Sequence, residues 1–263
     1  MKGKQKPTTR LSWPFKGGFA LCLALWGVLT FLPFLLSAQE DDPGLIRTLE
    51  TDSASVENTY YLLASFDNDT SNYHDIYLYG EGVFTLAKDF GVEADFPVLE
   101  DWDPLGRYPV GLGPIGLYLR YEAYHFGGWN SEQACVFSVE GGGAYGASNT
   151  TYRYIGSSWT IEALGGYRMG KVFIQGNYSF QGGIDPRVPS QFQANTGLGY
   201  SLGSNWYIQG EVDFTGVTAP FSNASWIFIP QIAFQPDEWL FEVGEALNET
   251  PAGVTEIMVA RTF

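Results

Sequence analysis

The feature that most constrains this chain is a two-residue alternation of apolar and polar side chains that recurs from about residue 59 to the end. Neighbouring side chains of a strand point to opposite faces, so the alternation predicts strands with one apolar and one polar face. About twelve segments of roughly ten residues show it, and this is the length that a tilted strand needs to cross a bilayer. The predicted strands lie at residues 59–66, 76–86, 90–98, 115–124, 135–145, 159–168, 172–180, 192–202, 206–214, 226–234, 239–243 and 257–263.

The connections between these segments alternate between short turns and longer polar stretches. Turns are expected at 88–89, 127–132, 169–170, 203–205 and 236–237, and longer loops at 67–75, 100–113, 146–158, 182–190, 216–223 and 247–253. Transmembrane barrels have short periplasmic turns and long extracellular loops, whereas a soluble β-sandwich has no reason to alternate in this way. Trp159, Trp206, Trp226 and Trp239 stand near predicted strand starts, which is typical of interfacial aromatic girdles.

The N-terminal region has the pattern of an export signal. Residues 1–16 hold five basic and no acidic side chains, and residues 17–36 carry no charge. Small residues at Ser37 and Ala38 offer a cleavage point, so we predict a signal peptide over residues 1–38, with an uncleaved transmembrane anchor as the alternative. An acidic periplasmic lead segment is then expected over residues 39–57, and an outer-membrane β-barrel over residues 58–263.

Charge and cysteine content limit the partners and the means of stabilisation. Removal of the signal leaves 9 basic and 29 acidic residues, a net charge of −20. Such a chain repels phosphate backbones, so nucleic-acid binding is not expected. Cys135 would be the only cysteine of the exported chain, and no intramolecular disulfide can then form. Stability must come from a closed hydrogen-bonded architecture or from a large core.

The polar faces of the predicted strands carry mostly acidic side chains, which would point into the lumen if the apolar faces contact lipid. Two hypotheses stay open: the few arginines pair with neighbouring acids to form an internal polar plug, or an acidic lumen passes cations or neutral solutes and excludes anions. On this assignment Glu93→Gln should alter ion selectivity and leave folding nearly intact, and Val212 and Ile174 should face lipid near the bilayer midplane. The lumen-lining candidates are Glu81, Glu93, Asp95, Arg120, Glu122, Glu140, Glu162, Arg168, Glu211, Asp213 and Glu242.

Catalytic and cofactor motifs are not indicated by the sequence. His74 is expected in an extracellular loop beside Ser71, and His125 at the opposite end of a strand, so the two histidines cannot share a site. We therefore expect no enzymatic activity, no cofactor and no metal. The alternatives to a channel are a structural or adhesive barrel that acts through its extracellular loops, and an outer-membrane lipid hydrolase.

With its export signal, alternating strands and terminal Phe263, the chain resembles bacterial outer-membrane β-barrels. Residues 90–97 and 113–121, Trp206 and the strand at 228–234 are similar to the MetA-pathway of phenol degradation family. The resemblance implies an all-β transmembrane antiparallel barrel in the bacterial outer membrane, with small, apolar or aromatic compounds as solutes. It also implies that the outer-membrane assembly machinery recognises the C-terminal strand ending in Phe263. Arg261 departs from the apolar residue usual two positions before the end.

Overall fold

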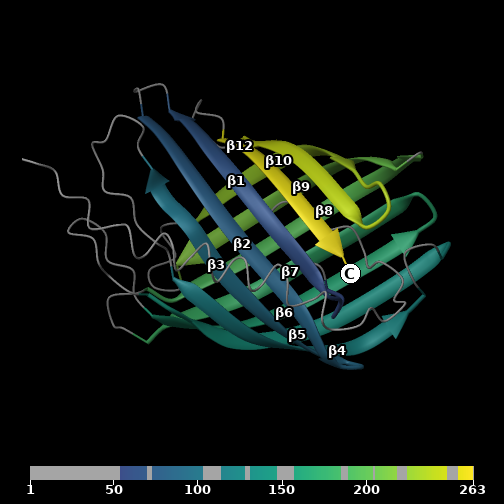
Figure 1. Cartoon of the computed structure of the whole chain (residues 1–263), viewed down its shortest axis with the longest axis horizontal. Coiled ribbons are helices and arrows are strands. Elements are labelled where there is room, and N and C mark those ends of the chain that lie inside the picture. Colours follow the sequence, from purple (N-terminus) through teal and green to yellow (C-terminus); the bar gives the residue numbers. More distant parts are fainter. Residues whose placement is uncertain are drawn as a thin grey trace, which may run out of the picture. The chain divides into compact units, whose positions relative to one another are not determined.

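Twelve antiparallel strands form one closed barrel in this computed structural model (Figure 1). The structure describes residues 54–69, 73–102, 114–127, 131–146, 157–184, 189–203, 205–217, 224–247 and 254–262. Each strand pairs with its neighbours in sequence. The strands are β1 (Thr59–Asp69), β2 (Tyr73–Ala87), β3 (Phe90–Trp102), β4 (Ile115–Phe126), β5 (Gln133–Tyr145), β6 (Ser158–Met169), β7 (Val172–Gly183), β8 (Gln191–Gly203), β9 (Trp206–Val217), β10 (Ser225–Phe234), β11 (Trp239–Ala246) and β12 (Val254–Thr262).

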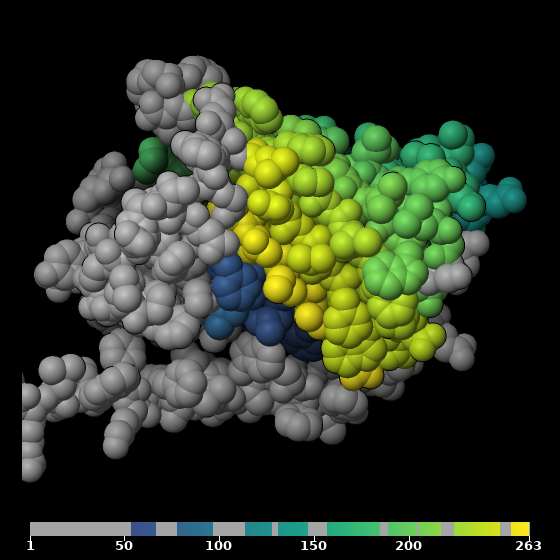
Figure 2. Space-filling view, turned by 90° about the horizontal axis from the view of Figure 1, so that it is seen from above, coloured from purple at the N-terminus to yellow at the C-terminus, as the bar shows by residue number. Residues whose placement is uncertain are grey.

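The barrel closes where β12 pairs with β1. The register runs from Thr59 opposite Thr262 to Asp67 opposite Val254, and Figure 2 shows the yellow C-terminal strands beside the blue N-terminal ones. Closure gives every strand two neighbours, so no backbone edge is left to face lipid. The predicted fold class, an antiparallel transmembrane barrel of about 12 strands, is confirmed. Among the described residues, no helix is both long enough and apolar enough to cross a membrane.

Side chains alternate between the outside and the inside of the barrel. In β11, Trp239, Phe241 and Val243 are exposed, whereas Leu240 and Glu242 are buried. The exposed apolar side chains continue around the barrel, and Leu119, Ile161 and Leu198 are examples from three other strands. An apolar surface of this extent is not stable in water, but it matches the hydrocarbon interior of a bilayer. The outer face is therefore the membrane-facing surface.

Aromatic pairs lie on this surface where strands end. The rings of Trp206 and Phe234 are 4.7 Å apart, at the start of β9 and the end of β10. The guanidinium of Arg261 lies 5.1 Å from the centre of the Trp239 ring, and it pairs with Glu238 at 3.3 Å. This arrangement explains how a charged residue is accommodated on the outer face of β12. The guanidinium is held at the barrel end by an aromatic ring and a carboxylate.

Several expected boundaries and faces are wrong. Strand β1 extends to Asp69 and strand β2 begins at Tyr73, so only residues 70–72 separate the two strands. His74 therefore lies in β2, opposite Asn68, instead of in a loop.

A register shift between Glu122 and Tyr124 turns Tyr124 outward, where a strict alternation would place it inside. Ile174 is the third residue of β7 and lies near one end of its strand, whereas Val212 is central in β9.

One glycine is required by the packing of the interior. Phe173 is buried inside the barrel and faces Gly199 across the β7–β8 pair, where a Cβ atom would overlap the Phe173 ring. We expect Gly199→Ala to destabilise the barrel by about 1–3 kcal/mol, because the ring has to leave its position. Urea unfolding of the refolded protein in lipid vesicles measures this cost. Gly165→Ala is the control, since its Cβ would meet its nearest atom at 3.9 Å; equal losses in both variants would contradict the assignment.

Candidate functional site: the barrel interior

The two ends of the barrel interior differ in chemistry. At one end, called here the turn end, lie the connections that follow β2, β4, β6, β8 and β10, together with the start of β1 and the end of β12. The other is called the loop end. Most buried apolar side chains belong to one cluster, which occupies mainly the turn-end half. The cluster includes Tyr61, Val83, Ala134, Val136, Leu164, Phe173, Tyr207, Ala233, Leu240, Met258 and Ala260.

A polar cavity of about 360 Å³ lies on the loop-end side of this cluster. Carboxylates line it from β2, β3, β5, β6 and β12, and neutral amides and hydroxyls line it from β7 and β8. The acidic lining residues are Glu81, Glu93, Asp95, Glu140, Glu162 and Glu256, and the neutral ones include Asn177, Ser179, Gln181, Gln193 and Asn195. The carboxylate oxygens of Glu81, Glu93 and Asp95 lie within 4.8 Å of one another. The cavity is therefore acidic on one side and neutral on the other.

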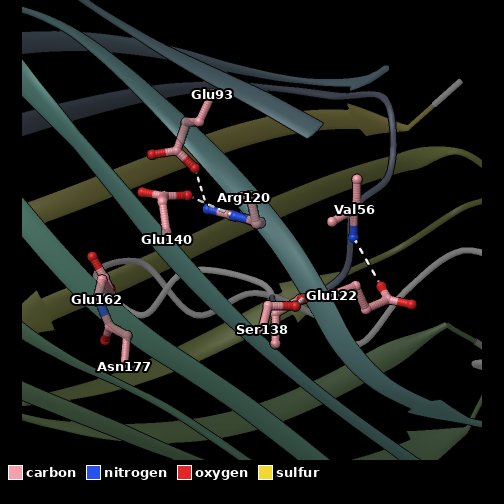
Figure 3. A network of polar contacts seen from close by, with 9 residues as sticks. Val56, Glu93, Arg120, Glu122, Ser138, Glu140, Glu162 and Asn177 are labelled. Carbon is pink, nitrogen blue, oxygen red and sulfur yellow. Dashed lines mark hydrogen bonds and ion pairs between the residues drawn. The ribbon is translucent and has the colours of Figure 1, made fainter. Parts of the chain in front are cut away.

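Arg120 holds two of these carboxylates in place. Its Nε donates to Glu140 Oε2 at 2.7 Å, and its Nη2 donates to Glu93 Oε2. Strand β4 lies between β3 and β5, and the register sets Arg120 opposite Gly91 on one side and Glu140 on the other. Figure 3 shows the two carboxylates converging on the guanidinium. Only 1% of the Arg120 side chain is exposed. A buried guanidinium needs this pairing, because an isolated buried charge is very unfavourable.

Three further carboxylates are bound by side-chain amides. Asn177 Nδ2 donates to Glu162 Oε1 at 2.5 Å, Gln209 Nε2 to Glu242 Oε1 at 2.7 Å, and Gln231 Nε2 to Glu211 Oε2 at 2.7 Å. Within the part of the chain that the structure describes, the buried amide oxygens of these three residues accept no hydrogen bond. In each pair the amide nitrogen donates to the carboxylate, and the amide oxygen is left as a hydrogen-bond acceptor toward the interior. The interior surface is rich in acceptors.

The structure brings most of the predicted lumen residues together. Eight are buried in the barrel and Asp95 is half-buried at the cavity. The other two, Glu122 and Arg168, lie near the turn end, where Glu122 binds the segment before β1 and Arg168 Nε donates to the Gly170 carbonyl at 3.0 Å. The eight buried residues are Glu81, Glu93, Arg120, Glu140, Glu162, Glu211, Asp213 and Glu242.

Sequence reasoning missed Glu256 and the three amides. Glu256 is buried and lines the cavity, and the outward positions of its neighbours Ile257 and Val259 were a signal that could have found it. The amides carry no charge, so the charge pattern of the predicted strands does not indicate them. Their role depends on which carboxylate each one faces across the barrel wall, and this depends on register.

The two histidines lie toward opposite ends of the barrel. His125 is exposed at the turn end of β4, where Nδ1 lies 2.9 Å from Glu122 Oε1 and Nε2 lies 2.6 Å from the Gly127 carbonyl oxygen. His74 belongs to the loop-end part of β2, as the register with Asn68 shows. Ser71, the expected neighbour of His74, lies outside the described residues.

The segment before β1, residues 54–58, is bound to the inner face of the wall near the turn end. Ser138 Oγ donates to the Ala54 carbonyl, and the Val56 amide donates to Glu122 Oε2 at 3.1 Å. Thr85 Oγ1 donates to the Val56 carbonyl at 3.0 Å. Ala54, Ser55 and Val56 are all buried. The last residues of the expected lead segment, 39–57, therefore contact the barrel interior. Residues 1–53 lie outside the described ranges.

Comparisons with known proteins identify the fold. An outer membrane channel from Pseudomonas putida F1 superposes with a TM-score of 0.56 at 12% identity, over 83% of this chain and 100% of that chain. A KdgM porin in complex with disordered oligogalacturonate superposes with a TM-score of 0.50 at 12% identity, over 78% and 99%. The chain has the fold of outer-membrane channel barrels. No family model matches it, and neither does any curated protein. At these identities the similarity concerns the fold, so function has to be argued from the interior of the barrel.

Proposed function

We propose that this protein is an outer-membrane channel for small solutes and that its lumen prefers cations over anions. The proposal rests on one observation, which is the acidic cavity inside a closed barrel whose outer face is apolar. A barrel of this size lies between small barrels filled by side chains and wide aqueous porins, so a narrow path is expected. Rings and clusters of acidic side chains favour cations in such a path.

The balance of charge inside the barrel supports the cation preference. Arg120 is bound by two carboxylates, whereas Glu162, Glu211 and Glu242 are bound by neutral amides. Pairing with an amide does not neutralise a carboxylate. The described interior therefore holds more negative than positive charge, and it offers amide oxygens as further ligands for a cation or for a solute rich in hydrogen-bond donors.

The narrower predictions concern the family, the solute and the assembly partner. Membership of the MetA-pathway of phenol degradation family rests on the strand segments quoted above and stays a prediction. An apolar or aromatic solute would not suit the polar cavity, so such a compound would have to leave the barrel sideways into the bilayer. Recognition of the C-terminal strand by the assembly machinery also stays a prediction, because Phe263 lies outside the described residues. The polar interior favours a channel over an enzyme.

Reversal potentials across a salt gradient test the proposal. We expect discrete, cation-selective conductance steps from the refolded chain in a planar bilayer, and a lower cation-to-anion permeability ratio for Glu162→Gln. Glu162 lines the cavity, and glutamine keeps its size while removing the charge. The effect should shrink in 1 M salt, where the screening length falls to about 3 Å.

The matched control is Glu245→Gln, which makes the same chemical change on the outer face of β11. It should leave the permeability ratio as it is. Anion-selective steps, or equal effects of the two substitutions, would contradict an acidic conduction path. A folded barrel without any conductance would favour the structural or adhesive alternative.

A further inference from the structure

A second group of buried carboxylates lies apart from the Arg120 ion pairs, on β9 and β12. Glu211 and Asp213 are two residues apart on the inner face of β9, and Glu256 belongs to β12. Asp213 lies within hydrogen-bonding reach of Glu211 and close enough to Glu256 for the two charges to interact. All three residues are buried, and Asp213 is the most exposed of them at 8%. Like charges therefore gather at a place that bulk water hardly reaches.

The surroundings of Asp213 point to a positively charged ligand. Both of its carboxylate oxygens are buried, and neither accepts a hydrogen bond from any residue that the structure describes. The neighbour that it contacts, Glu211, is itself an acceptor when ionised. Arg120 is the one buried base of the described chain, and Glu93 and Glu140 already bind it. A buried carboxylate without a donor or a base is very unfavourable, so its charge needs another partner.

An amide oxygen adds a further ligand beside the two carboxylates of β9. Gln231 Nε2 donates to Glu211 Oε2 at 2.7 Å, and this bond fixes the orientation of the amide. Gln231 Oε1 is buried and accepts no hydrogen bond within the described ranges. Carboxylate and amide oxygens together are the ligands that hard cations such as Ca²⁺ take in proteins.

We propose that Glu211, Asp213 and Gln231 bind a divalent cation with the chemistry of Ca²⁺ on the inner wall of β9 and β10. One divalent ion neutralises both carboxylates, whereas a single shared proton leaves one charge buried. Ca²⁺ accepts about six to eight oxygens in a flexible geometry, so water can complete its shell, whereas Mg²⁺ requires a near-octahedral set and dehydrates reluctantly. The ion is a resident part of the barrel, and its binding does not depend on conduction.

The site has a route from the polar cavity. Glu256 and Asn195 both line the cavity, and Asn195 faces Asp213 across the β8–β9 pair. On the other side, Gln231 faces Gly244 of β11, and Gly244 faces Glu256 of β12, so no side chain stands between Gln231 and Glu256 in that row. Glu256 thus adds negative charge between the cavity and the site, which attracts a cation toward it.

Calorimetric titration of the refolded chain in a non-ionic detergent, after removal of metals with EDTA, tests the proposal. We expect one tightly bound Ca²⁺ per folded barrel and weaker binding of Mg²⁺. Asp213→Asn keeps the size of the side chain and removes its charge, and it should weaken Ca²⁺ binding by about tenfold or more. The matched control is Asp95→Asn, the same change in the separate carboxylate cluster of Glu81, Glu93 and Asp95, which should keep the affinity of the parent.

Several results would overturn the site. Parent affinity in Asp213→Asn, equal losses in both variants, or Mg²⁺ bound as tightly as Ca²⁺ would each do so. No Ca²⁺ binding by the parent would do so as well, and the two carboxylates of β9 would then share a proton. If Asp213→Asn does not fold, as judged by heat-modified migration in gels, Gln231→Met replaces it, and parent affinity in that variant would again overturn the site. Cation-selective conductance from a barrel that binds no Ca²⁺ would remove the site and keep the channel function.

Discussion

Replacing Arg120 by methionine is expected to destabilise the barrel by about 3–5 kcal/mol, the typical cost of removing one partner from a buried ion pair. Methionine fills much of the same volume, so the loss would come from charge rather than from a cavity. The variant leaves Glu93 and Glu140 facing the same site, with 5% and 3% of their side chains exposed and without the guanidinium that both carboxylates contact. Urea unfolding in lipid vesicles, followed by tryptophan fluorescence, measures the loss.

The control for Arg120→Met is a triple variant that removes the charge of Arg120 together with the charges of both carboxylates. Arg120→Met combined with Glu93→Gln and Glu140→Gln should regain most of the lost stability, because neutral groups of similar size often replace a buried ion network without cost. If the single and the triple variant lost the same amount, the effect would come from packing and the electrostatic explanation would be wrong. A single variant within about 1 kcal/mol of the parent, the range of an exposed pair, would show that water reaches the site.

Val212→Arg is expected to destabilise the barrel by about 2–4 kcal/mol, the cost of an arginine facing lipid at the bilayer midplane. Val212 is central in β9 and 46% exposed, so its side chain points away from the interior. Its partner across the β9–β10 pair is Phe228, which also faces outward and offers no carboxylate. The same unfolding measurement in vesicles gives the change.

The control for this substitution introduces an arginine at a different depth in the membrane. Leu86→Arg places the same charge on the outer face one residue before β2 ends, where the expected cost is about 0–1 kcal/mol. Similar costs at both positions would show that the apolar belt does not lie across the bilayer as described. In detergent micelles, where the surroundings are thinner and more adaptable, the difference between the two variants should become smaller.

The sequence predicted the wall of the barrel because the wall follows a local rule. Alternation around Trp239, Phe241 and Val243 is enough to assign the two faces of β11, whatever the other strands do. The register shift at Glu122 follows no such rule, since it inserts one residue without a distinctive motif. Tyr124 was therefore assigned to the wrong face, whereas Leu117, Leu119 and Tyr121 are exposed, as the alternation predicted.

The partners inside the barrel could not be predicted in the same way. Arg120 meets Glu93 and Glu140 because of the stagger between β3, β4 and β5, and a shift of two residues would keep the same faces while changing both partners. The structure also changes the expectation for Glu93→Gln, since that substitution removes one of two carboxylates from Arg120 and so affects stability as well as selectivity. The contacts of residues 54–58 with the inner wall could not be predicted either, because Ala54, Ser55 and Val56 carry neither charge nor periodicity.

The seam between β1 and β12 sets the order in which the chain can fold. Thr59 and Thr262 face each other across it with hydroxyl oxygens 3.5 Å apart, although 203 positions separate them in the sequence. Contacts between residues so distant form late, because the chain must first pay the entropy of closing a long loop. Ala54 comes only five residues before Thr59, and it needs a finished wall around it. The residues that leave the ribosome early are thus among the last to reach their native positions.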